Sequence, residues 1–200
     1  MQFDDGSGAA EIPGFLSFAE VKEFYALYRD ISWIPATIYD ENNEAVRDDW
    51  RKAQTSNILK EKFLDKIKKR ANFWFKTLNY EYYNFDISDN WMSEEEGLVL
   101  CKYEPGDYFN WHRDWDWAYN DPKKNPNTKK KLSCVIQFSD ETDYTGGDLE
   151  IFGGSRVYAA PKGQGSAIIF PGFQFHRVTE VKTGLRITGL IFCHGDEHLK

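Results

Sequence analysis

The sequence predicts a mainly β fold of jelly-roll type that is braced by helices near its N-terminus. From about residue 80 onward, short runs rich in β-branched and aromatic residues recur at close, fairly regular spacing. Turn residues separate these runs, for example Pro105-Gly106 and Gly146-Gly147. Before residue 80, apolar residues recur instead at helical spacing. Many short strands with frequent turns are typical of a sandwich or a barrel, and helices would cover one of its sheets.

The length and charge of the chain limit its organisation and its partners. Its 200 residues suffice for one domain with a real core. Its net charge of −7 argues against a general nucleic-acid binder, so we expect no nucleic-acid partner. We expect a single domain over residues 1–200, with a helical support region over about 1–79 and a jelly-roll core over about 80–195. The sequence does not indicate an oligomeric state.

Cysteine usage and hydropathy predict a location. The three cysteines, Cys101, Cys134 and Cys193, are widely spaced and form no CxxC motif, which favours a reducing compartment. The first ten residues are acidic and lack the apolar segment of a signal peptide. No apolar run approaches the ~20 residues needed to cross a bilayer. We therefore expect a cytoplasmic protein without a membrane partner.

Two helices are expected before residue 80. The first covers about residues 17–30, where Ser17 as N-cap and Glu20 three residues later form a capping-box pattern. The second covers about residues 55–78 and is capped by Thr55 or Ser56. Its apolar stripe consists of Ile58, Leu59, Phe63, Ile67, Ala71 and Phe75.

Nine strand-like runs follow. Their residues alternate in polarity or are β-branched and aromatic, and each run is short enough for a strand. They cover residues 80–87, 97–104, 108–115, 131–139, 148–152, 156–161, 166–171, 174–181 and 185–193. Packed as two sheets, they predict a jelly-roll core.

Two histidines and an aspartate within this core suggest a metal site. His112 and Asp114 are two residues apart, so on a strand both side chains would project from the same face. His176 lies in a later strand of the same region. Two histidines and one carboxylate form the facial triad of non-haem Fe(II) sites, which leaves coordination positions open. Zinc accepts the same ligands, so these residues alone leave the metal undecided.

An arginine in the next strand adds a second feature. If residues 174–181 and 185–193 are neighbouring antiparallel strands joined at Thr183-Gly184, Arg186 faces the same cavity as His176. A buried arginine needs an anionic partner, and its planar fork suits a carboxylate. Thr188 is two residues further and would share that face. The pattern therefore favours a site that binds an organic acid beside a metal.

These motifs resemble a known family. "YEPGDYFNWHRD" over residues 103–114 looks like a conserved block of Fe(II)/2-oxoglutarate oxygenases of the prolyl-4-hydroxylase superfamily. "KLSCVIQFSDETDYTGGDLEIF" over residues 131–152 resembles the bacterial and phage branch of PKHD-type hydroxylases. "SAIIFPGFQFHRVTEVKTGLRITGLIF" over residues 166–192 is similar to the closing block of that branch. The resemblance covers about residues 98–193 and implies a double-stranded β-helix, the jelly-roll core of these enzymes.

The resemblance implies a role for each site residue. His112, Asp114 and His176 would bind Fe(II), and Arg186 would bind the C5 carboxylate of 2-oxoglutarate. Tyr103 would help to hold that carboxylate. Two more positions would contact the cosubstrate: Gln137 and Thr188.

The resemblance also implies the reaction. The chain would be a 2-oxoglutarate-dependent dioxygenase that uses O₂ to hydroxylate an unactivated C–H bond and releases succinate and CO₂. The presence of Asp114 favours hydroxylation over halogenation, since related halogenases lack this carboxylate. Ascorbate would serve as an accessory reductant. The substrate would be a peptide or a small molecule, with a prolyl or other amino-acid residue favoured.

The segment after the metal pair suggests a substrate lid. Residues 115–131 form a long loop whose aromatic start includes Trp117 and Tyr119. We expect Trp111 and Trp115 to be core or rim residues, and Asp116 to lie in the loop or behind the metal ligands. The basic run at 123–131 is expected to be solvated.

Other interpretations remain at this point. His194 and His198 are four residues apart, a metal-binding spacing, but we expect a solvated tail. A metal-binding hydrolase on a cupin-like barrel would use the same triad without needing Arg186 or Tyr103. An oxygenase acting on a non-amino-acid small molecule would need all of them. A binding protein without activity, or a capsid-like jelly roll, would need neither the triad nor the arginine.

Overall fold

The computed structural model describes most of the chain. The described residues are 1–200 except 5, 40–44, 47–49, 59–61, 93–95, 116–128 and 196–200. Within these residues, neither helix combines the length and the apolarity that a membrane crossing requires.

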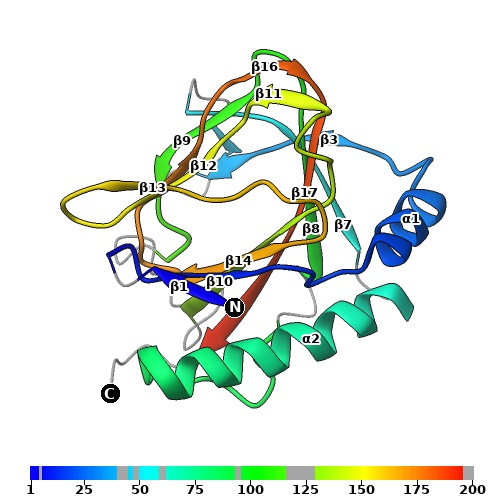
Figure 1. Cartoon of the computed structure of the whole chain (residues 1–200). Helices are drawn as coiled ribbons and strands as arrows, with labels where there is room; N and C mark the ends of the chain where they lie inside the picture. Colours follow the sequence, from blue (N-terminus) through cyan, green and yellow to red (C-terminus); the bar gives the residue numbers. More distant parts are fainter. Residues whose placement is uncertain are drawn as a thin grey trace.

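Eight antiparallel strands form the larger sheet (Figure 1). Strands from both ends of the chain meet in it, because β2 pairs with β14 and β8 pairs with β17. In order across the sheet, the strands are β1 (Gln2–Asp4), β2 (Ala9–Ile12), β14 (Ala167–Pro171), β10 (Lys129–Gln137), β17 (Arg186–Gly195), β8 (Leu98–Tyr103), β7 (Gln54–Ile58) and β3 (Ile34–Pro35).

A smaller antiparallel sheet faces the larger one and completes the jelly-roll core that the sequence predicts. Its order is β13 (Val157–Ala159), β12 (Leu149–Phe152), β15 (His176–Val178), β9 (Tyr108–His112) and β6 (Arg51–Lys52). Two further pairs are β11 (Tyr144–Gly146) with β16 (Val181–Gly184), and β4 (Ile38–Tyr39) with β5 (Ala45–Val46).

Two helices cover the outer face of the larger sheet. α1 (Phe18–Leu27) and α2 (Lys62–Leu78) lie on the same side of the barrel, with α2 running along its base (Figure 1). The buried stripe of α2 includes Phe63, Ile67, Ala71 and Phe75, and it packs in one cluster with outward-facing residues of β10 such as Cys134. The opposite face of β10 is therefore free to line the space between the sheets.

The predicted cap of α1 is confirmed. The Ser17 hydroxyl accepts a bond from the Glu20 amide at 3.3 Å, and the Ser17 amide donates to the Glu20 carboxylate at 2.8 Å. Arg70 of α2 binds the same carboxylate, with Nη2 2.8 Å from Oε1. Arg70 foremost, together with Ser17, lowers the pKa of Glu20 to about 2, although burial opposes this shift. Glu20 of the α1 capping box thus also connects α1 to α2.

The predicted cap of the second helix is wrong. Thr55 and Ser56 lie in β7, where they pair with Cys101 and Leu100 of β8, and α2 begins only at Lys62. Helical spacing in the sequence did not show this, because the pairing partner that makes β7 a strand lies about 45 residues further along the chain. The region before residue 80 also contributes β1, β2, β3 and β6, so it is not purely helical.

The strand predicted over residues 80–87 is also wrong. Residues Asn79–Tyr83 extend α2 as a π-helical turn, and Asn84 ends it in the left-handed conformation with φ 54°. The Asn79 side chain accepts from the Phe85 amide at 2.7 Å and donates to its carbonyl at 2.9 Å, which stabilises the turn. These local side-chain bonds override the β-type pattern of the tyrosines.

The prediction that His194 lies in a solvated tail is wrong. β17 continues to Gly195 because β10 pairs with it from Thr188 to Gly195. His194 is buried, and its Nε2 lies 2.9 Å from the carboxylate of Glu96, which also binds Lys130 at 2.7 Å. His198 lies outside the described residues.

Glu96 is expected to make stability depend on acid pH. Burial raises its pKa, but the bond to His194 and the charge of Lys130 outweigh this and lower the pKa to about 2. Because the pKa is lower in the folded state, the ionised Glu96 carboxylate stabilises the fold at pH values above its ordinary pKa of 4.5. This stabilisation is lost as the pH falls toward 2. Glu96→Gln should therefore lower the free energy of unfolding by about 1 kcal/mol at pH 7.

Urea unfolding at a series of pH values tests this. The difference between wild type and Glu96→Gln should shrink as the pH falls from 4.5 toward 2. Glu23→Gln is a suitable control, because the Glu23–Lys66 pair lies on the exposed helical surface. A pH-independent difference would show that the Glu96 charge does not stabilise the fold.

Candidate active site

Three potential metal ligands meet in the smaller sheet. His112 ends β9 and pairs directly with His176 at the start of β15. The His176 Nε2 lies 3.5 Å from Asp114 Oδ2, and the His112 Nε2 lies 3.9 Å from Asp114 Oδ1. The three ligand atoms all lie within 4.8 Å of one another, which is close enough to hold one ion. The structure thus brings together the three residues that the sequence singled out.

A β-bulge sets the orientation of His112. His176 pairs with His112, and Val178 pairs with Phe109. Three residue steps along β9 therefore lie opposite two residue steps along β15, which is the irregularity of a bulge. His176 and Val178 share one face of β15, so Phe109 and His112 also share a face. Their rings stack with centroids 3.4 Å apart. This neighbour of His112 was not predicted, because a strict two-residue alternation places Phe109 on the opposite face.

Asp114 is held differently from what the sequence indicated. β9 ends at His112, so Asp114 does not project from the strand. Instead, the amides of Asp114 and Trp115 both donate to the Gly172 carbonyl, at 3.0 and 2.9 Å. A side chain at Gly172 would overlap the carbonyl oxygen of Lys130, so glycine allows the backbone at this position to lie close to β10. A long-range backbone contact, rather than strand geometry, carries the carboxylate to the histidines.

Hydrogen bonds orient all three ligands. His112 Nδ1 lies 2.7 Å from the Asn110 carbonyl, and His176 Nδ1 lies 2.9 Å from the Gln174 carbonyl. A carbonyl only accepts, so each Nδ1 carries the proton and each Nε2 keeps its lone pair. The Ser133 hydroxyl donates to Asp114 Oδ2 at 2.6 Å. The lone pairs of both histidines therefore point toward the carboxylate.

The electrostatics favour the metal-binding forms of His112 and Asp114. Burial, followed by the nearby His176, lowers the pKa of His112 to about 3, so its imidazole is neutral at pH 7. Burial raises the pKa of Asp114, but His176, His112 and the Ser133 hydroxyl more than offset this, so its pKa is lowered. A neutral imidazole and an ionised carboxylate are the forms that bind metals.

Ser133 was not identified from the sequence, and we expect it to position Asp114. Ser133→Ala removes the bond to Oδ2 without opening a cavity, and loss of such a supporting contact typically costs about 10–100-fold in metal affinity. Isothermal titration with Mn(II) under anaerobic conditions measures this loss. Ser139→Ala is the matched control, because that buried serine bonds to the Leu185 carbonyl and the Ile187 amide. Equal metal affinity in both variants would contradict the positioning role.

Arg186 lies in the larger sheet, opposite the metal ligands. It is 1% exposed, it begins β17, and it pairs with Tyr103 of β8, whose ring centroid is 5.3 Å from the guanidinium carbon. Its Nε and Nη2 are buried and have no hydrogen-bond partner among the described residues. Unsatisfied buried N–H groups of a charged side chain are costly, so this geometry indicates a missing anion.

The strand pairing that the sequence suggested for Arg186 is wrong. β15 pairs with β9 and β12, whereas β17 pairs with β10 and β8. Between them, β16 pairs with β11, and Gly184 with φ 79° lies close against the backbone of Asp143. The chain therefore crosses from one sheet to the other at this turn. Arg186 faces the metal ligands across the barrel.

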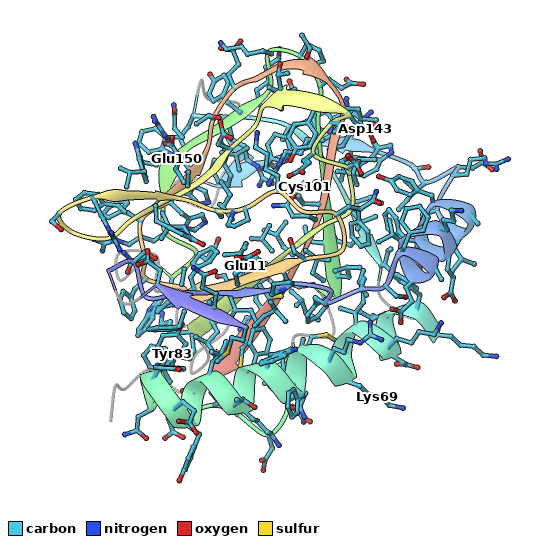
Figure 2. The ribbon with its side chains drawn as sticks, in the orientation of Figure 1. Glu11, Lys69, Tyr83, Cys101, Asp143 and Glu150 are labelled. Carbon is cyan, nitrogen blue, oxygen red and sulfur yellow. The ribbon has the colours of Figure 1, made fainter. Side chains whose placement is uncertain are left out.

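Gln137 and Thr188 lie beside Arg186. Thr188 is two residues along β17 from Arg186 and pairs with both Gln137 of β10 and Cys101 of β8. Paired residues of antiparallel strands share a face, so these side chains form a row across the inner face of the sheet. All of them are buried, and the Gln137 Oε1 has no hydrogen-bond partner in the described part of the chain. Figure 2 shows Cys101 in the interior between the sheets.

The tryptophans beside the metal ligands have different environments. Trp115 is 2% exposed and packs near Phe173, so its prediction as a core residue is confirmed. Trp111 is half-buried next to Phe152 and under the guanidinium of Arg177. The predictions for Asp116, Trp117, Tyr119 and most of the lid over 115–131 fall outside the described residues, since 116–128 are not described. Of the basic run at 123–131, the last three residues lie in β10 and Lys131 is buried, so the prediction that the run is solvated is wrong for Lys131.

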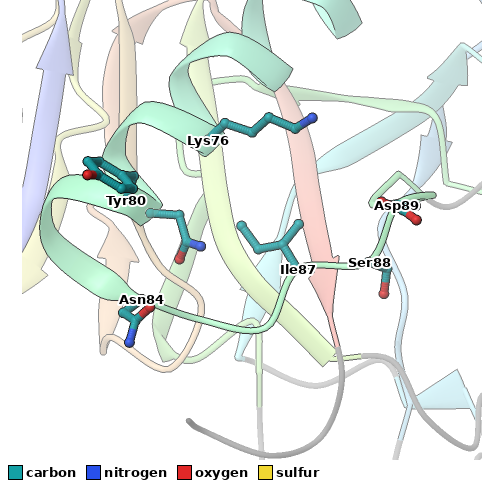
Figure 3. Close-up of a pocket in the computed structure, with 7 residues that line it drawn as sticks. Lys76, Tyr80, Asn84, Ile87, Ser88 and Asp89 are labelled. Carbon is teal, nitrogen blue, oxygen red and sulfur yellow. The ribbon is translucent and has the colours of Figure 1, made fainter.

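A pocket at the end of α2 is separate from this constellation. Figure 3 shows it between the last turn of the helix and the segment after it, with Lys76, Tyr80, Asn84 and Ser88 among its lining. The described residues that line it include no histidine or cysteine.

Comparison with known proteins agrees with this geometry. Residues 98–194 match the family model described as the 2OG-Fe(II) oxygenase superfamily. The match covers just under half of the chain, and over this segment the chain is similar to that superfamily. The matched segment runs from β8 to β17, so it contains all the residues of the candidate site described above.

Curated relatives point to the same branch. A PKHD-type hydroxylase of Sphingopyxis alaskensis is 31% identical over 94 residues, which cover 47% of this chain and 42% of the relative. The chain thus spans about two fifths of the length of that relative.

Solved structures share the fold over nearly the whole chain. A viral collagen prolyl hydroxylase from Paramecium bursaria Chlorella virus-1 superposes with a TM-score of 0.67 at 18% identity, covering 96% of this chain and 98% of that one. A prolyl-4-hydroxylase from Pseudomonas putida gives 0.69 at 16% identity, covering 94% and 92%. At such identities the likeness shows the fold of the chain alone, a jelly-roll core with helical support.

Proposed function

We propose that the chain is an Fe(II)- and 2-oxoglutarate-dependent dioxygenase that hydroxylates an unactivated C–H bond and releases succinate and CO₂. One observation carries this proposal. The His112, Asp114 and His176 cluster faces a buried Arg186 whose Nε and Nη2 have no partner among the described residues. A metal site beside an unsatisfied arginine suits a chelating organic acid with a second carboxylate.

The residues present fit both groups. Two imidazoles and one carboxylate match the facial triad that Fe(II) favours, and they leave positions open for other ligands. Arg186 and the hydroxyl of Tyr103 would hold the C5 carboxylate of 2-oxoglutarate. Two further side chains on the same face would contact the cosubstrate: Gln137 and Thr188. When bound, Fe(II) supplies the redox chemistry with O₂ that no side chain provides.

The protein's own contribution is orientation and exclusion of water. The backbone carbonyls behind His112 and His176 fix both rings, and Ser133 fixes Asp114. The bidentate geometry of Arg186 would fix the far end of the cosubstrate. Apolar residues cluster on the inner faces of both sheets and would help to exclude water from the site.

A prolyl or other amino-acid residue is the substrate we favour, in a peptide or as a free molecule. The support is the likeness to PKHD-type hydroxylases in sequence and to prolyl hydroxylases in fold. An oxygenase acting on another small molecule would use the same site. A hydrolase on this barrel would give no role to the unsatisfied Arg186, which argues against it. Ascorbate would act only as an accessory reductant.

The decisive experiment is an anaerobic titration of the purified protein with Fe(II) and 2-oxoglutarate. We expect a visible charge-transfer band that requires both components. Zinc in place of Fe(II) is the control and should give no band. Absence of the band with Fe(II) would contradict the proposed function.

The substrate is tested separately. Proline, proline-containing peptides and a panel of amino acids are incubated with the loaded enzyme in air. Mass spectrometry should show a product heavier by one oxygen atom, with succinate formed in step. A product found only on a nucleobase or a lipid would contradict the prolyl assignment and leave the oxygenase assignment intact.

A further inference from the structure

A second arginine points into the same space from the edge of the smaller sheet. Arg51 lies on β6, the last strand of that sheet, and it pairs with Phe109 of β9. Its guanidinium carbon lies 4.5 Å from the centre of the Phe109 ring. His112 stacks on that ring at 3.4 Å and so occupies one face, which leaves the other face to Arg51. Only the phenyl ring therefore separates Arg51 from a metal ligand.

Arg51 also lies close to the residues that surround Arg186. Its Nη2 is 3.4 Å from the sulfur of Cys101. The charges of both Arg51 and Arg186 act on Cys101 and on Tyr103, which are two residues apart on β8. Arg51 thus borders the site between the cosubstrate anchor and the metal ligands.

Among the residues that the structure describes, Arg51 has no anionic partner of its own. No ion pair joins it to another described residue, and its Nε is buried without a hydrogen-bond partner. Burial raises the pKa of the Cys101 thiol and the pKa of the Tyr103 phenol, so both neighbours are neutral at pH 7. Asp114 acts on Arg51 from further away, and its charge belongs to the metal cluster. Its contacts with the Cys101 sulfur and with the Tyr103 hydroxyl are contacts with neutral groups, which are weak substitutes for a carboxylate.

The charge of the proposed complex points in the same direction. Fe(II), Arg51 and Arg186 together carry four positive charges, and Asp114 cancels one. The 2-oxoglutarate dianion cancels two more, which leaves one positive charge in a largely buried site. An unpaired charge in such a site is costly, so a further anion is favoured.

We propose that Arg51 binds a carboxylate of the organic substrate and so selects acidic substrates. This inference rests on the proposed function, and it adds the chemical class of the substrate. A carboxylate fits because the guanidinium fork offers parallel N–H groups, and because the edge position of β6 places Arg51 where a substrate can approach. The carboxylate of a free amino acid, or of a C-terminal residue, has this chemistry.

The test compares acids with their matched amides. Isothermal titration measures binding of L-proline and L-prolinamide, and of N-acetyl-proline and its amide, to protein loaded with Mn(II) and 2-oxoglutarate. Other amino acids and their amides complete the panel. For at least one pair, the wild type should bind the acid at least about tenfold more tightly than the amide.

Variants assign that preference to Arg51. Arg51→Gln should abolish the preference for the acid, and Arg51→Lys should retain part of it, since a point charge replaces the fork only partly. Lys52→Gln is the matched control, because Lys52 is the exposed neighbour on β6 and pairs with Asp107 at 3.5 Å. It should keep the full preference. Circular dichroism checks that each variant is folded.

The affinity for 2-oxoglutarate shows whether Arg51 binds a carboxylate of the substrate or a carboxylate of 2-oxoglutarate. It should be unchanged in Arg51→Gln and should fall in Arg186→Gln. An equal fall in both would place Arg51 in the cosubstrate anchor and overturn the proposal. A wild type that prefers no acid in the panel would also overturn it. Calorimetry with Mn(II) does not depend on the visible band of Fe(II), so failure of the proposed function is seen separately.

Discussion

His176→Ala is expected to abolish Fe(II) binding and 2-oxoglutarate turnover. His176 contributes one of three ligand atoms that lie within 4.8 Å of one another, and two ligands cannot hold the ion in a defined geometry. Loss of a hydrogen bond that supports a metal ligand already lowers metal affinity about 10–100-fold. Loss of the ligand itself should therefore lower the affinity by more than about 100-fold. Anaerobic titration with Fe(II) and a succinate assay measure the two effects. His112→Ala and Asp114→Ala should behave in the same way.

His194→Ala provides the matched control. His194 is also a buried histidine, but it bonds to Glu96 at the far end of β17 from Arg186. We expect this variant to lose some stability and to keep metal affinity and turnover. Full activity in His176→Ala would remove that residue from the metal site, whereas a similar loss in both variants would indicate a general effect on folding.

Arg186→Ala is expected to raise the 2-oxoglutarate dissociation constant at least about thirtyfold. Loss of a buried charged partner costs about 2–5 kcal/mol, because the carboxylate is left without its counterion. Arg186→Lys should restore binding only in part. Tyr103→Phe should cost less, about 1–2 kcal/mol, since it removes one hydrogen bond to a charged group. Calorimetric titration of the Mn(II)-loaded protein measures all three.

Arg177→Ala is the control for this series. Arg177 also lies in the barrel, but its Nε binds Glu150 at 2.6 Å and its guanidinium covers Trp111. Its removal should leave 2-oxoglutarate affinity unchanged. An unchanged affinity in Arg186→Ala would contradict the cosubstrate assignment, even if turnover were lost.

The jelly-roll core could be predicted because its signal is local. Eight of the nine expected runs contain observed strands, since β-branched and aromatic residues between turn residues specify short strands directly. The exception, residues 80–87, forms a π-helical turn through the side chain of Asn79. The short strands before residue 60 were missed because two to five residues carry little periodicity, and they form only by pairing with a sheet that is already in place.

The candidate site was predicted residue by residue but not in its geometry. The types and order of His112, Asp114, His176 and Arg186 are sufficient to suggest an acid-binding metal site. The strand partners of His176 and Arg186 were predicted wrongly, because nothing within residues 174–193 shows that the chain crosses between sheets at β16. Arg186 and the metal ligands nevertheless line the same space, since the two sheets that carry them face each other across the barrel.

By itself, the sequence determined which side chains are available, where most of the core strands lie and how α1 is capped. Only the tertiary structure decided that Asp114 is carried by the backbone of Gly172, that Ser133 orients it, and that Arg51 reaches the site. The reason is the range of the interactions. Periodicity and caps depend on neighbours within a few residues, whereas each of these contacts joins segments 19 to 58 positions apart, whose register is fixed by pairing and packing of the whole barrel.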